Sequence, residues 1–392
     1  MRRFLFYAHD GPGLGPVRRA LAVARALTEA AVDASILVVT SAEEVESLGL
    51  PPRVGVLRLP GPYAADQKVL AAAVEIFRPE IVLVDTHPFG SEGELGPALE
   101  IVRAAGAGAV LALPDVIDEP GAVGLEWRTR GFYERIPESY DRVLVYGQPD
   151  LLDPVRDCGF PAGIAAITSF CGYVVSSSPG DGATAARSRA SAVTLRPARV
   201  LATAGESDDG FPVLEAFVEA AAVAGWQATV VAGSRAQSQR LEMLRTNAAD
   251  TGISFRDFVP SLPSELSSLD ALVCMGGYNT LAEAAASGVP TVCTPRVEPM
   301  RDQLIRARAF SSRGLLRVVE PGLLTPELLR TEVEGALAAG PSPVGTRLDL
   351  GGSRRAAHHL LELAARHWIR EPTERGVAEA TLQLSVPAGV RL

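Results

Sequence analysis

The chain has 392 residues, 47% of them hydrophobic, and a formal net charge of −9 from 37 basic and 46 acidic residues. A chain of this length is expected to form about two domains. Its apolar content is sufficient for two hydrophobic cores and excludes a disordered chain. The basic residues are scattered along the sequence, which argues against nucleic acid as a partner.

The sequence lacks the signals of an exported or membrane-bound protein. The only apolar run near the amino terminus, Phe4 to Ala8, is too short for the central region of a signal peptide. No run approaches the roughly 20 apolar residues of a membrane helix. We therefore predict a cytoplasmic protein without a transmembrane segment.

Cysteine and histidine spacing predicts neither a disulfide nor a metal site. The four cysteines have no close-pair spacing. They are Cys158, Cys171, Cys274 and Cys293. His358 and His359 are neighbours on an expected helix and point to different sides, so they are not expected to share a metal.

Short apolar runs alternate with helical segments through the first half of the chain. The predicted strands are Phe4 to Ala8, Ser35 to Val39, Val54 to Leu57, Ile81 to Val84, Ala109 to Leu113 and Val143 to Tyr146, and the clearest helices are Val17 to Glu29 and Gly93 to Ala105. Alternation of this kind predicts an α/β domain with a parallel sheet that is covered by helices on both faces.

The segment from Ser176 to Ala198 is rich in Ser, Ala and Gly and reads as an interdomain linker. The alternation then restarts. The later strands are Val200 to Thr203, Ala228 to Val231, Ala271 to Cys274, Thr291 to Cys293 and Leu315 to Val319, and the later helices are Phe211 to Val223, Gln237 to Ala248, Thr280 to Ala286, Met300 to Ser311 and Arg354 to Ile369. We expect a first Rossmann-like domain over residues 1–175, a linker over 176–198 and a second such domain over 199–352. A helix and tail over 353–392 are expected to follow, and one arrangement open to them is packing back on the first domain.

The most informative motif runs from Met275 through two glycines to Glu283. An apolar strand ends there and a helix opens at Asn279 or Thr280, so unpaired backbone N–H groups face outward where an anion could bind. Thr280 and Glu283 are three residues apart and share a helix face, and a carboxylate can accept two hydrogen bonds from a ribose diol. An ordinary strand, turn and helix with a solvated Glu283 is the alternative.

A second glycine-rich loop, Gly11 to Gly15, follows the first strand and opens a helix. Such a loop can approach a phosphate or a sugar. A nicotinamide site would need an acidic residue at the end of the second strand, but that strand ends in Thr40 and Ser41. A tight turn without a ligand also remains open.

The whole chain resembles the two-domain GT-B nucleotide-sugar glycosyltransferases. It is most similar to predicted bacterial transferases related to glycosyltransferase family 28 and to the peptidoglycan N-acetylglucosaminyltransferase. The resemblance rests on Phe6-Tyr7, Gly13 to Gly15, Arg18 to Ala20, Asp85 to Gly90, Val143 to Pro149, Cys171 to Val174 and the block from Gly276 to Gln303.

The resemblance implies a donor site in the second domain and an acceptor site in the first. Glu283 would hold the ribose, Gly276, Gly277 and Thr280 the diphosphate, and Asp302 with Gln303 the hexose, although Asp302 and Gln303 could instead cap a helix. The other implied donor-site residues are Phe258 and Val259 beside the base, together with Gly205, Tyr278, Asn279 and Arg296. The acceptor-side loop comprises Gly11, Gly13, Leu14 and Gly15.

Two departures from the family pattern affect the chemistry. The family's glycine-rich loop usually continues into a histidine, but this chain has Pro16. The candidates for the catalytic base are therefore His9, Asp10, Asp85 and His87, unless the acceptor needs little deprotonation. The second departure is the acidic run Glu206 to Asp209 in a loop that approaches the diphosphate in the family, where Asp208 and Asp209 could cap the next helix.

The sequence thus predicts a transferase of a hexose or amino-hexose from a nucleoside diphosphate sugar, with UDP as the expected nucleotide. It is expected to act on a small-molecule acceptor with inversion, without a metal or other cofactor, and natural-product biosynthesis is a hypothesis for its role. Specificity is expected to depend on Tyr278, Arg296 and the segment Glu119 to Pro137. A sugar-nucleotide 2-epimerase and a non-catalytic nucleotide-sugar-binding homologue are the alternatives.

Overall fold

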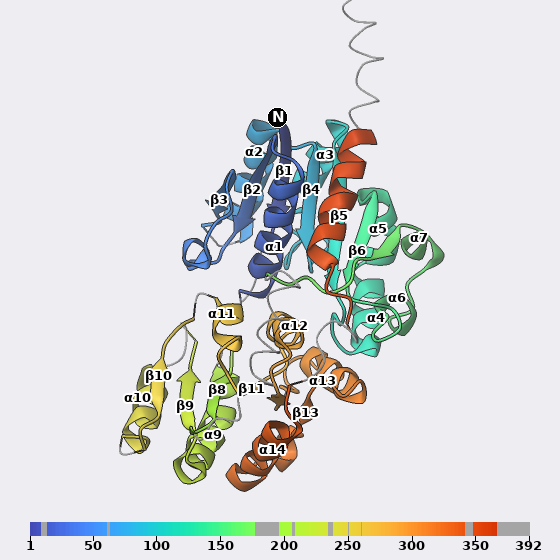
Figure 1. Ribbon diagram of the computed structural model, residues 1–392. Coiled ribbons are helices and arrows are strands. Elements are labelled where there is room, and N and C mark those ends of the chain that lie inside the picture. Colours follow the sequence, from blue (N-terminus) through green and yellow to red (C-terminus); the bar gives the residue numbers. More distant parts are fainter. Residues whose placement is uncertain are drawn as a thin grey trace, which may run out of the picture.

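The chain folds into two α/β lobes, one above the other in Figure 1. The computed structural model describes residues 1–8, 14–60, 63–176, 196–205, 208–233, 238–249, 251–259, 261–341 and 348–366. Most of the predicted linker, the tail after 366, and the candidates His9, Asp10, Gly11, Gly13 and Glu206 lie outside the described residues.

The upper lobe contains a seven-stranded parallel sheet with the order β3-β2-β1-β4-β5-β6-β7. The strands are β1 (Arg2–Tyr7), β2 (Ala34–Thr40), β3 (Val54–Arg58), β4 (Ile81–Asp85), β5 (Gly108–Pro114), β6 (Arg142–Tyr146) and β7 (Thr168–Phe170). Every residue of β4 and β5 is buried. This is why they read as continuous apolar runs, as central strands of parallel sheets do.

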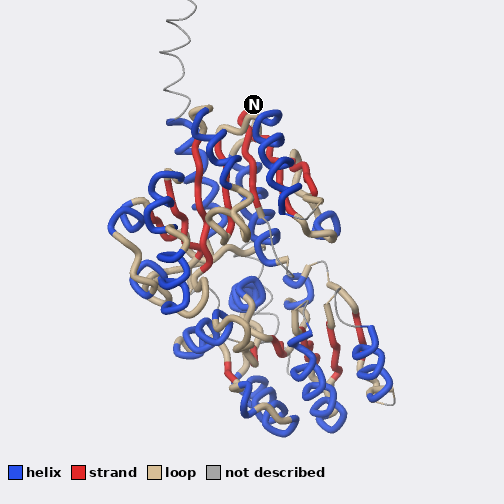
Figure 2. The backbone as a smooth tube through the Cα atoms, turned by 180° about the vertical axis from the view of Figure 1, so that it is seen from behind, coloured by secondary structure: helices blue, strands red, loops and turns tan. Residues whose placement is uncertain are grey.

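Helices cover both faces of this sheet (Figure 2). They are α1 (Gly15–Ala30), α2 (Tyr63–Phe77), α3 (Gly96–Ala104), α4 (Pro120–Thr129), α5 (Phe132–Ser139), α6 (Pro154–Asp157) and α7 (Ala162–Ala166). One face packs on α1, and the other packs mainly on α2, α3 and α5. Pro16 lies in the first turn of α1, a position that favours proline because the missing N–H has no partner inside the helix.

The lower lobe repeats the design with a six-stranded parallel sheet of order β10-β9-β8-β11-β12-β13. The strands are β8 (Arg199–Thr203), β9 (Gln227–Val231), β10 (Ser254–Arg256), β11 (Ala271–Cys274), β12 (Thr291–Cys293) and β13 (Arg317–Val318), and the helices are α9 (Phe211–Ala224), α10 (Ser238–Asn247), α11 (Leu262–Leu266), α12 (Tyr278–Ser287), α13 (Asp302–Ser312) and α14 (Pro326–Ala339). The predicted doubly wound α/β class is confirmed.

The chain returns to the upper lobe at its end. Residues 352–366 are helical, and Figure 1 shows this red helix against the upper lobe. Its buried residues Ala356 and Leu360 belong to the same hydrophobic cluster as the α1 face of the upper sheet. Arg355 Nε donates to the carbonyl of Cys171 at 2.6 Å, and Ser353 Oγ donates to the carbonyl of Val175 at 3.0 Å.

Candidate active site

A cavity of about 500 Å³ lies between the lobes. In each sheet the strand order reverses beside the first strand, between β1 and β4 above and between β8 and β11 below. The residues that line the cavity follow the carboxyl ends of these four strands and their neighbours, from Leu14, Thr86 and Val116 above to Gly205 and Gly277 below. Ligands of doubly wound sheets bind at this position.

The glycine turn before α12 reaches the cavity through Gly277. Gly276 has φ of 91°, and a Cβ there would lie 3.1 Å from Cys293 Sγ and 3.2 Å from the Gln303 carbonyl oxygen, so this position requires glycine. Gly277 has φ of −59° with open space around it. The helix begins at Tyr278, one or two residues before the predicted start at Asn279 or Thr280. Its first-turn N–H groups lack partners within the helix. An anion bound here would also be favoured by the helix dipole.

Glu283 lies one turn further along α12 and lines the same cavity as Thr280 and Gly277. The side chain is buried rather than solvated. Its Oε1 accepts a hydrogen bond of 2.5 Å from the backbone N–H of Ser176. Ser176 directly follows the last residues of the upper lobe in the sequence. The carboxylate is thus held in place by the Ser176 N–H, and the alternative of a solvated glutamate is excluded.

Arg296, Asp302 and Gln303 follow β12 and line the cavity. The Arg296 guanidinium lies 3.5 Å from Asp302 Oδ1 and 3.4 Å from Asp209 Oδ2, and its backbone N–H donates to Gln303 Oε1 at 3.1 Å. Asp209 does not cap α9, whose cap is Gly210 without a side-chain hydrogen bond. Its charge is instead opposed by Arg296.

Gly205, Phe258 and Val259 line the far end of the lower side. Gly205 has φ of 79°, a conformation that favours glycine. The guanidinium of Arg18 from the upper lobe lies 5.9 Å from the Phe258 ring centre. Phe258 and Val259 are the two residues that the resemblance puts beside the base of the nucleotide.

Two of the sequence-predicted donor residues contact the upper lobe. Asn279 Nδ2 donates to the carbonyl of Gly15 at 3.0 Å, which joins the starts of α12 and α1. Tyr278 is buried, stacks on Tyr173 with ring centres 5.7 Å apart, and accepts a hydrogen bond from the Val174 N–H at 2.9 Å. Burial raises the pKa of the Tyr278 hydroxyl. Both side chains thus hold the lobes together while bordering the cavity.

The structure separates the described candidates for the catalytic base. Asp85 is 2% exposed and does not line the cavity. It receives two hydrogen bonds from Arg19, with Nη2 to Oδ1 at 2.6 Å and Nε to Oδ2 at 3.1 Å, and a third from Thr86 Oγ1 at 2.6 Å. His87, in contrast, lines the cavity together with Leu14 and Gly15 of the predicted acceptor-side loop.

The turn that carries His87 has an unusual backbone. Thr86 has φ of 72°, a strained conformation for a β-branched residue. Its hydroxyl accepts from Arg19 Nη2 at 3.0 Å, and its N–H donates to the carbonyl of Ala112. The buried Arg19–Asp85 pair therefore fixes the turn that brings His87 to the cavity wall.

The sequence analysis missed the charged residues at the contact between the lobes. Arg306 on α13 and Asp115 after β5 form a buried ion pair, with Nε to Oδ1 at 2.8 Å. Burial lowers the pKa of Arg306, but the Asp115 and Asp302 carboxylates outweigh it and raise the pKa above its ordinary value. The spacing of Asp302 and Arg306, one helical turn apart, was the available signal.

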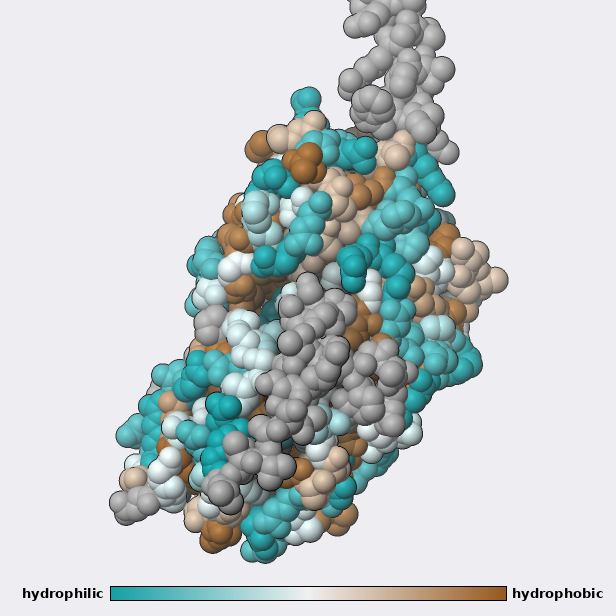
Figure 3. Space-filling model, in the orientation of Figure 1, coloured by the Kyte–Doolittle hydropathy of each residue, from teal (hydrophilic) through white to brown (hydrophobic). Residues whose placement is uncertain are grey.

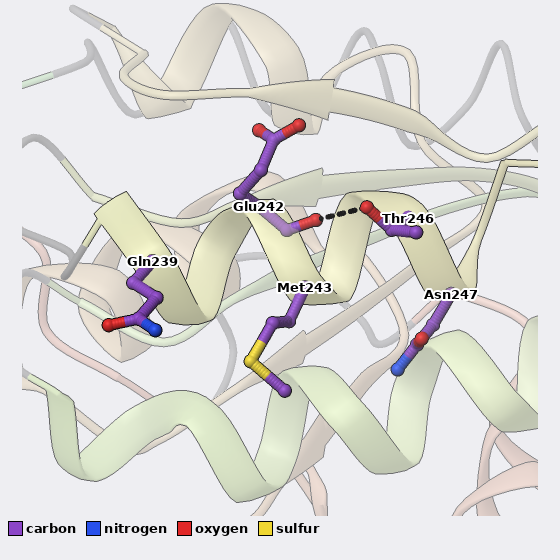
Figure 4. Close-up of a pocket in the computed structure, with 5 residues that line it drawn as sticks. All are labelled: Gln239, Glu242, Met243, Thr246 and Asn247. Carbon is purple, nitrogen blue, oxygen red and sulfur yellow. Dashed lines mark hydrogen bonds between the residues drawn. The ribbon is translucent and has the colours of Figure 1, made fainter.

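A hollow also lies outside the cavity between the lobes. A shallow hollow on α10 is lined by Gln239, Glu242, Met243, Thr246 and Asn247, and Figure 4 shows them along one helix, with Met243 and Asn247 directed toward α9. Among the described residues, no group of three or more His, Cys, Asp or Glu side chains could hold a metal. No described helix combines the length and apolar character required to cross a bilayer.

Comparison with known proteins identifies the lower lobe. Residues 213–343 match the family described as the glycosyltransferase family 28 C-terminal domain. The crystal structure of Acinetobacter baumannii MurG superposes with a TM-score of 0.59 at 15% identity, covering 92% of this chain and 99% of that one. The glycotransferase of kitacinnamycin gives a TM-score of 0.58 at 19% identity, with 93% and 99% covered. Residues 213–343 are thus similar to the family 28 C-terminal domain, and the chain as a whole has the GT-B fold.

The curated relatives share part of the sequence. Each of two is a UDP-N-acetylglucosamine–N-acetylmuramyl-(pentapeptide) pyrophosphoryl-undecaprenol N-acetylglucosamine transferase. The Corynebacterium efficiens protein is 32% identical over 76 residues, 19% of this chain and 21% of its own length. The Bacillus thuringiensis protein is 26% identical over 165 residues, 41% of this chain and 45% of its own length. The chain therefore spans less than half of each of these relatives.

Proposed function

We propose that this protein is a glycosyltransferase that moves a hexose or amino-hexose from a nucleoside diphosphate sugar to a small-molecule acceptor. The observation that carries the proposal is one cavity that is lined by Gly277, Thr280 and Glu283 of the lower lobe and by His87 of the upper lobe. The lower side offers N–H groups for a diphosphate and a carboxylate for a ribose. The upper side offers an imidazole.

In the proposed reaction, an acceptor hydroxyl oxygen forms a bond to the anomeric carbon and passes its proton to His87. The bond from that carbon to the diphosphate oxygen breaks, and its electron pair stays on the leaving nucleoside diphosphate. Negative charge grows there, and the N–H groups of Gly277 and the first turn of α12 are fixed donors for it. Attack from the opposite side inverts the anomeric carbon.

The acceptor is proposed to lie against the upper lobe. That part of the cavity wall contains apolar side chains of α4 and its neighbours, among them Ile117, Val123 and Phe132, with Glu126 and Arg130 beside them. An acceptor with an apolar body and a hydroxyl group fits such a wall. A natural product of this kind, with UDP as the donor nucleotide, is the working hypothesis, and the kitacinnamycin glycotransferase among the structural neighbours motivates it.

Two substitutions test the division of roles. Glu283→Gln should weaken binding of UDP by about 10-fold or more in calorimetry, because a hydrogen bond to a charged group contributes about 1.5–3 kcal/mol. His87→Gln should leave UDP affinity unchanged and lower turnover at saturating donor by about 100-fold or more, as loss of a general base does.

The wild-type protein is first screened against UDP, TDP, GDP and ADP by thermal shift. A raised melting temperature with one of them identifies the nucleotide. Unchanged turnover in His87→Gln, or equal loss of donor and acceptor affinity in Glu283→Gln, would contradict the assigned roles. Recovery of an epimerised donor sugar instead of a glycoside would show that the protein is a sugar-nucleotide epimerase and not a transferase.

A further inference from the structure

Arg306 has the largest side chain among the fully buried described residues and is 1% exposed. It lies on α13 of the lower lobe, within the wall of the cavity. A charged side chain is almost never buried to this extent without partners. The hydrogen-bond partners of the guanidinium therefore indicate the role of Arg306.

The guanidinium divides its hydrogen bonds between the lobes. Toward the upper lobe, Nε donates to Asp115 Oδ1 at 2.8 Å and Nη2 donates to the Val116 carbonyl at 3.3 Å. Toward the lower lobe, Nη1 donates to the Gly276 carbonyl at 3.2 Å and to Asp302 Oδ2 at 3.1 Å. A planar guanidinium with five donors in fixed directions can link these groups only at one relative placement of the lobes.

The partner on the upper lobe is itself held rigidly. Asp115 directly follows β5, its Oδ1 accepts from the Val116 N–H at 2.9 Å, and its Oδ2 accepts from the Tyr173 hydroxyl at 3.1 Å. The Tyr173 ring packs on Tyr278 of α12 and on Phe310 of α13. The carboxylate that receives Arg306 is therefore part of the upper sheet's framework rather than of a loose loop.

The partner on the lower lobe is the peptide unit of the proposed diphosphate site. The carbonyl of Gly276 and the N–H of Gly277 belong to the same planar, trans peptide, so they point in opposite directions. Because Arg306 holds the carbonyl on the α13 side, the Gly277 N–H is directed away from α13. Gly277 lines the cavity, and we take this N–H as the donor offered to the space proposed for the diphosphate.

We propose that Arg306 is a positioning residue that orients the Gly276–Gly277 peptide and, through Asp115, fixes the spacing between the donor and acceptor lobes. The inference rests on the proposed function for its catalytic meaning. The two roles can be tested separately because Asp115 bonds to Arg306, whereas only Arg306 bonds to the Gly276 carbonyl. Loss of Asp115 affects the approach of donor and acceptor, whereas loss of Arg306 also affects the donor's diphosphate contact.

The first experiment compares transfer with donor hydrolysis in Asp115→Asn and Arg306→Met. Asp115→Asn should retain its affinity for UDP within about 3-fold and lose about 100-fold in transfer turnover, the effect of a misplacement of about 1 Å. Hydrolysis of the donor by water should change far less, since water needs no fixed lobe spacing. Arg306→Met should lose donor affinity as well. Arg308→Gln, on the same helix but exposed and paired with Glu320, is the matched control and should behave as wild type.

A double variant keeps the test valid if the single variants do not fold. Asp115→Leu with Arg306→Met replaces the buried pair by apolar side chains, a change that proteins often tolerate. The folded double variant should show the raised ratio of hydrolysis to transfer. A wild-type ratio in a folded Asp115→Asn or double variant would overturn the inference.

A second measurement does not depend on any substrate. The four native cysteines are buried, so fluorescent labels can be attached after Ile76→Cys on α2 and Val223→Cys on α9, two strongly exposed positions. The distance distribution between the lobes should be narrow in the otherwise wild-type protein and broader in the double variant. Equal widths would refute the spacing role. Failure of wild type to bind any nucleoside diphosphate, with the broadening still present, would refute only the proposed function.

Discussion

The two adjacent glycines before α12 are expected to respond in opposite ways to the same substitution. Gly276→Ala forces a non-glycine residue to φ of 91° and brings its Cβ within 3.1 Å of Cys293 Sγ and 3.2 Å of the Gln303 carbonyl. Backbone strain costs about 1–3 kcal/mol, and overpacking adds about 1–3 kcal/mol. Since 1 kcal/mol shifts the melting temperature by about 2–4 °C in a domain of 150–250 residues, Gly276→Ala should lower it by at least about 4 °C.

Gly277→Ala adds a methyl group in open space at φ of −59° and ψ of 142°, which any residue can adopt. The less favourable cap and the restricted unfolded chain act in opposite directions, so stability should change by less than about 1 kcal/mol. The methyl group nevertheless enters the proposed diphosphate space. We expect UDP affinity to fall by about 10-fold or more, or about 1.4 kcal/mol.

Thermal unfolding by circular dichroism and titration calorimetry with UDP measure the two effects on the same preparations. The reasoning requires a large stability loss for Gly276→Ala and a binding loss without a matching stability loss for Gly277→Ala. Wild-type melting of Gly276→Ala would show that the turn is not strained. Wild-type UDP affinity of Gly277→Ala would show that the diphosphate does not approach this N–H.

The fold was predictable because its signals are local in the sequence. Buried parallel strands such as β4 and β5 must be apolar along their whole length, and helices between them follow from the alternation. The prediction missed β7 and β10, which have three residues each and leave too short a pattern. It also missed α14, although Thr325 accepts a capping hydrogen bond from the Leu328 N–H and proline follows it, a recognisable helix start.

The candidate site also has parts that the sequence could predict and parts that it could not. The turn from Gly276 to Glu283 lies within one stretch of sequence, so its geometry could be inferred from the order of strand, glycines and helix. Arg306 and Asp115 are 191 positions apart, and no local pattern pairs them. Asp85 illustrates the reverse problem, because its position at a strand end suggested a base. Its partner, Arg19 on α1, lies 66 positions away in the sequence, so the ion pair could not be inferred from a local pattern.

The surface carries no comparable signal on the face that Figure 3 shows. Among the coloured atoms, hydrophilic and hydrophobic side chains are intermixed on both lobes. A monomeric soluble surface normally has this mixture. The buried Arg19–Asp85 ion pair and the partly buried His359 give two further predictions.

Asp85→Asn leaves Arg19 charged without its carboxylate at a site where both side chains are almost fully buried. Unfolding in urea should show a loss of about 3–5 kcal/mol; a variant that keeps wild-type stability but loses turnover would instead make Asp85 the base. His359 gives a pH dependence, because burial and then the charge of Arg142 lower its pKa from the ordinary value of 6.5. A histidine with a lowered folded-state pKa favours the folded state in its neutral form. Its contribution is therefore fully present above about pH 6.5 and is lost as the pH falls through that value toward the lower folded-state pKa. His359→Gln keeps an acceptor for the Arg142 guanidinium but does not titrate. The melting temperature of wild type should therefore fall more steeply between about pH 7.5 and 5.5 than that of the variant, and parallel curves would mean that His359 titrates alike in both states.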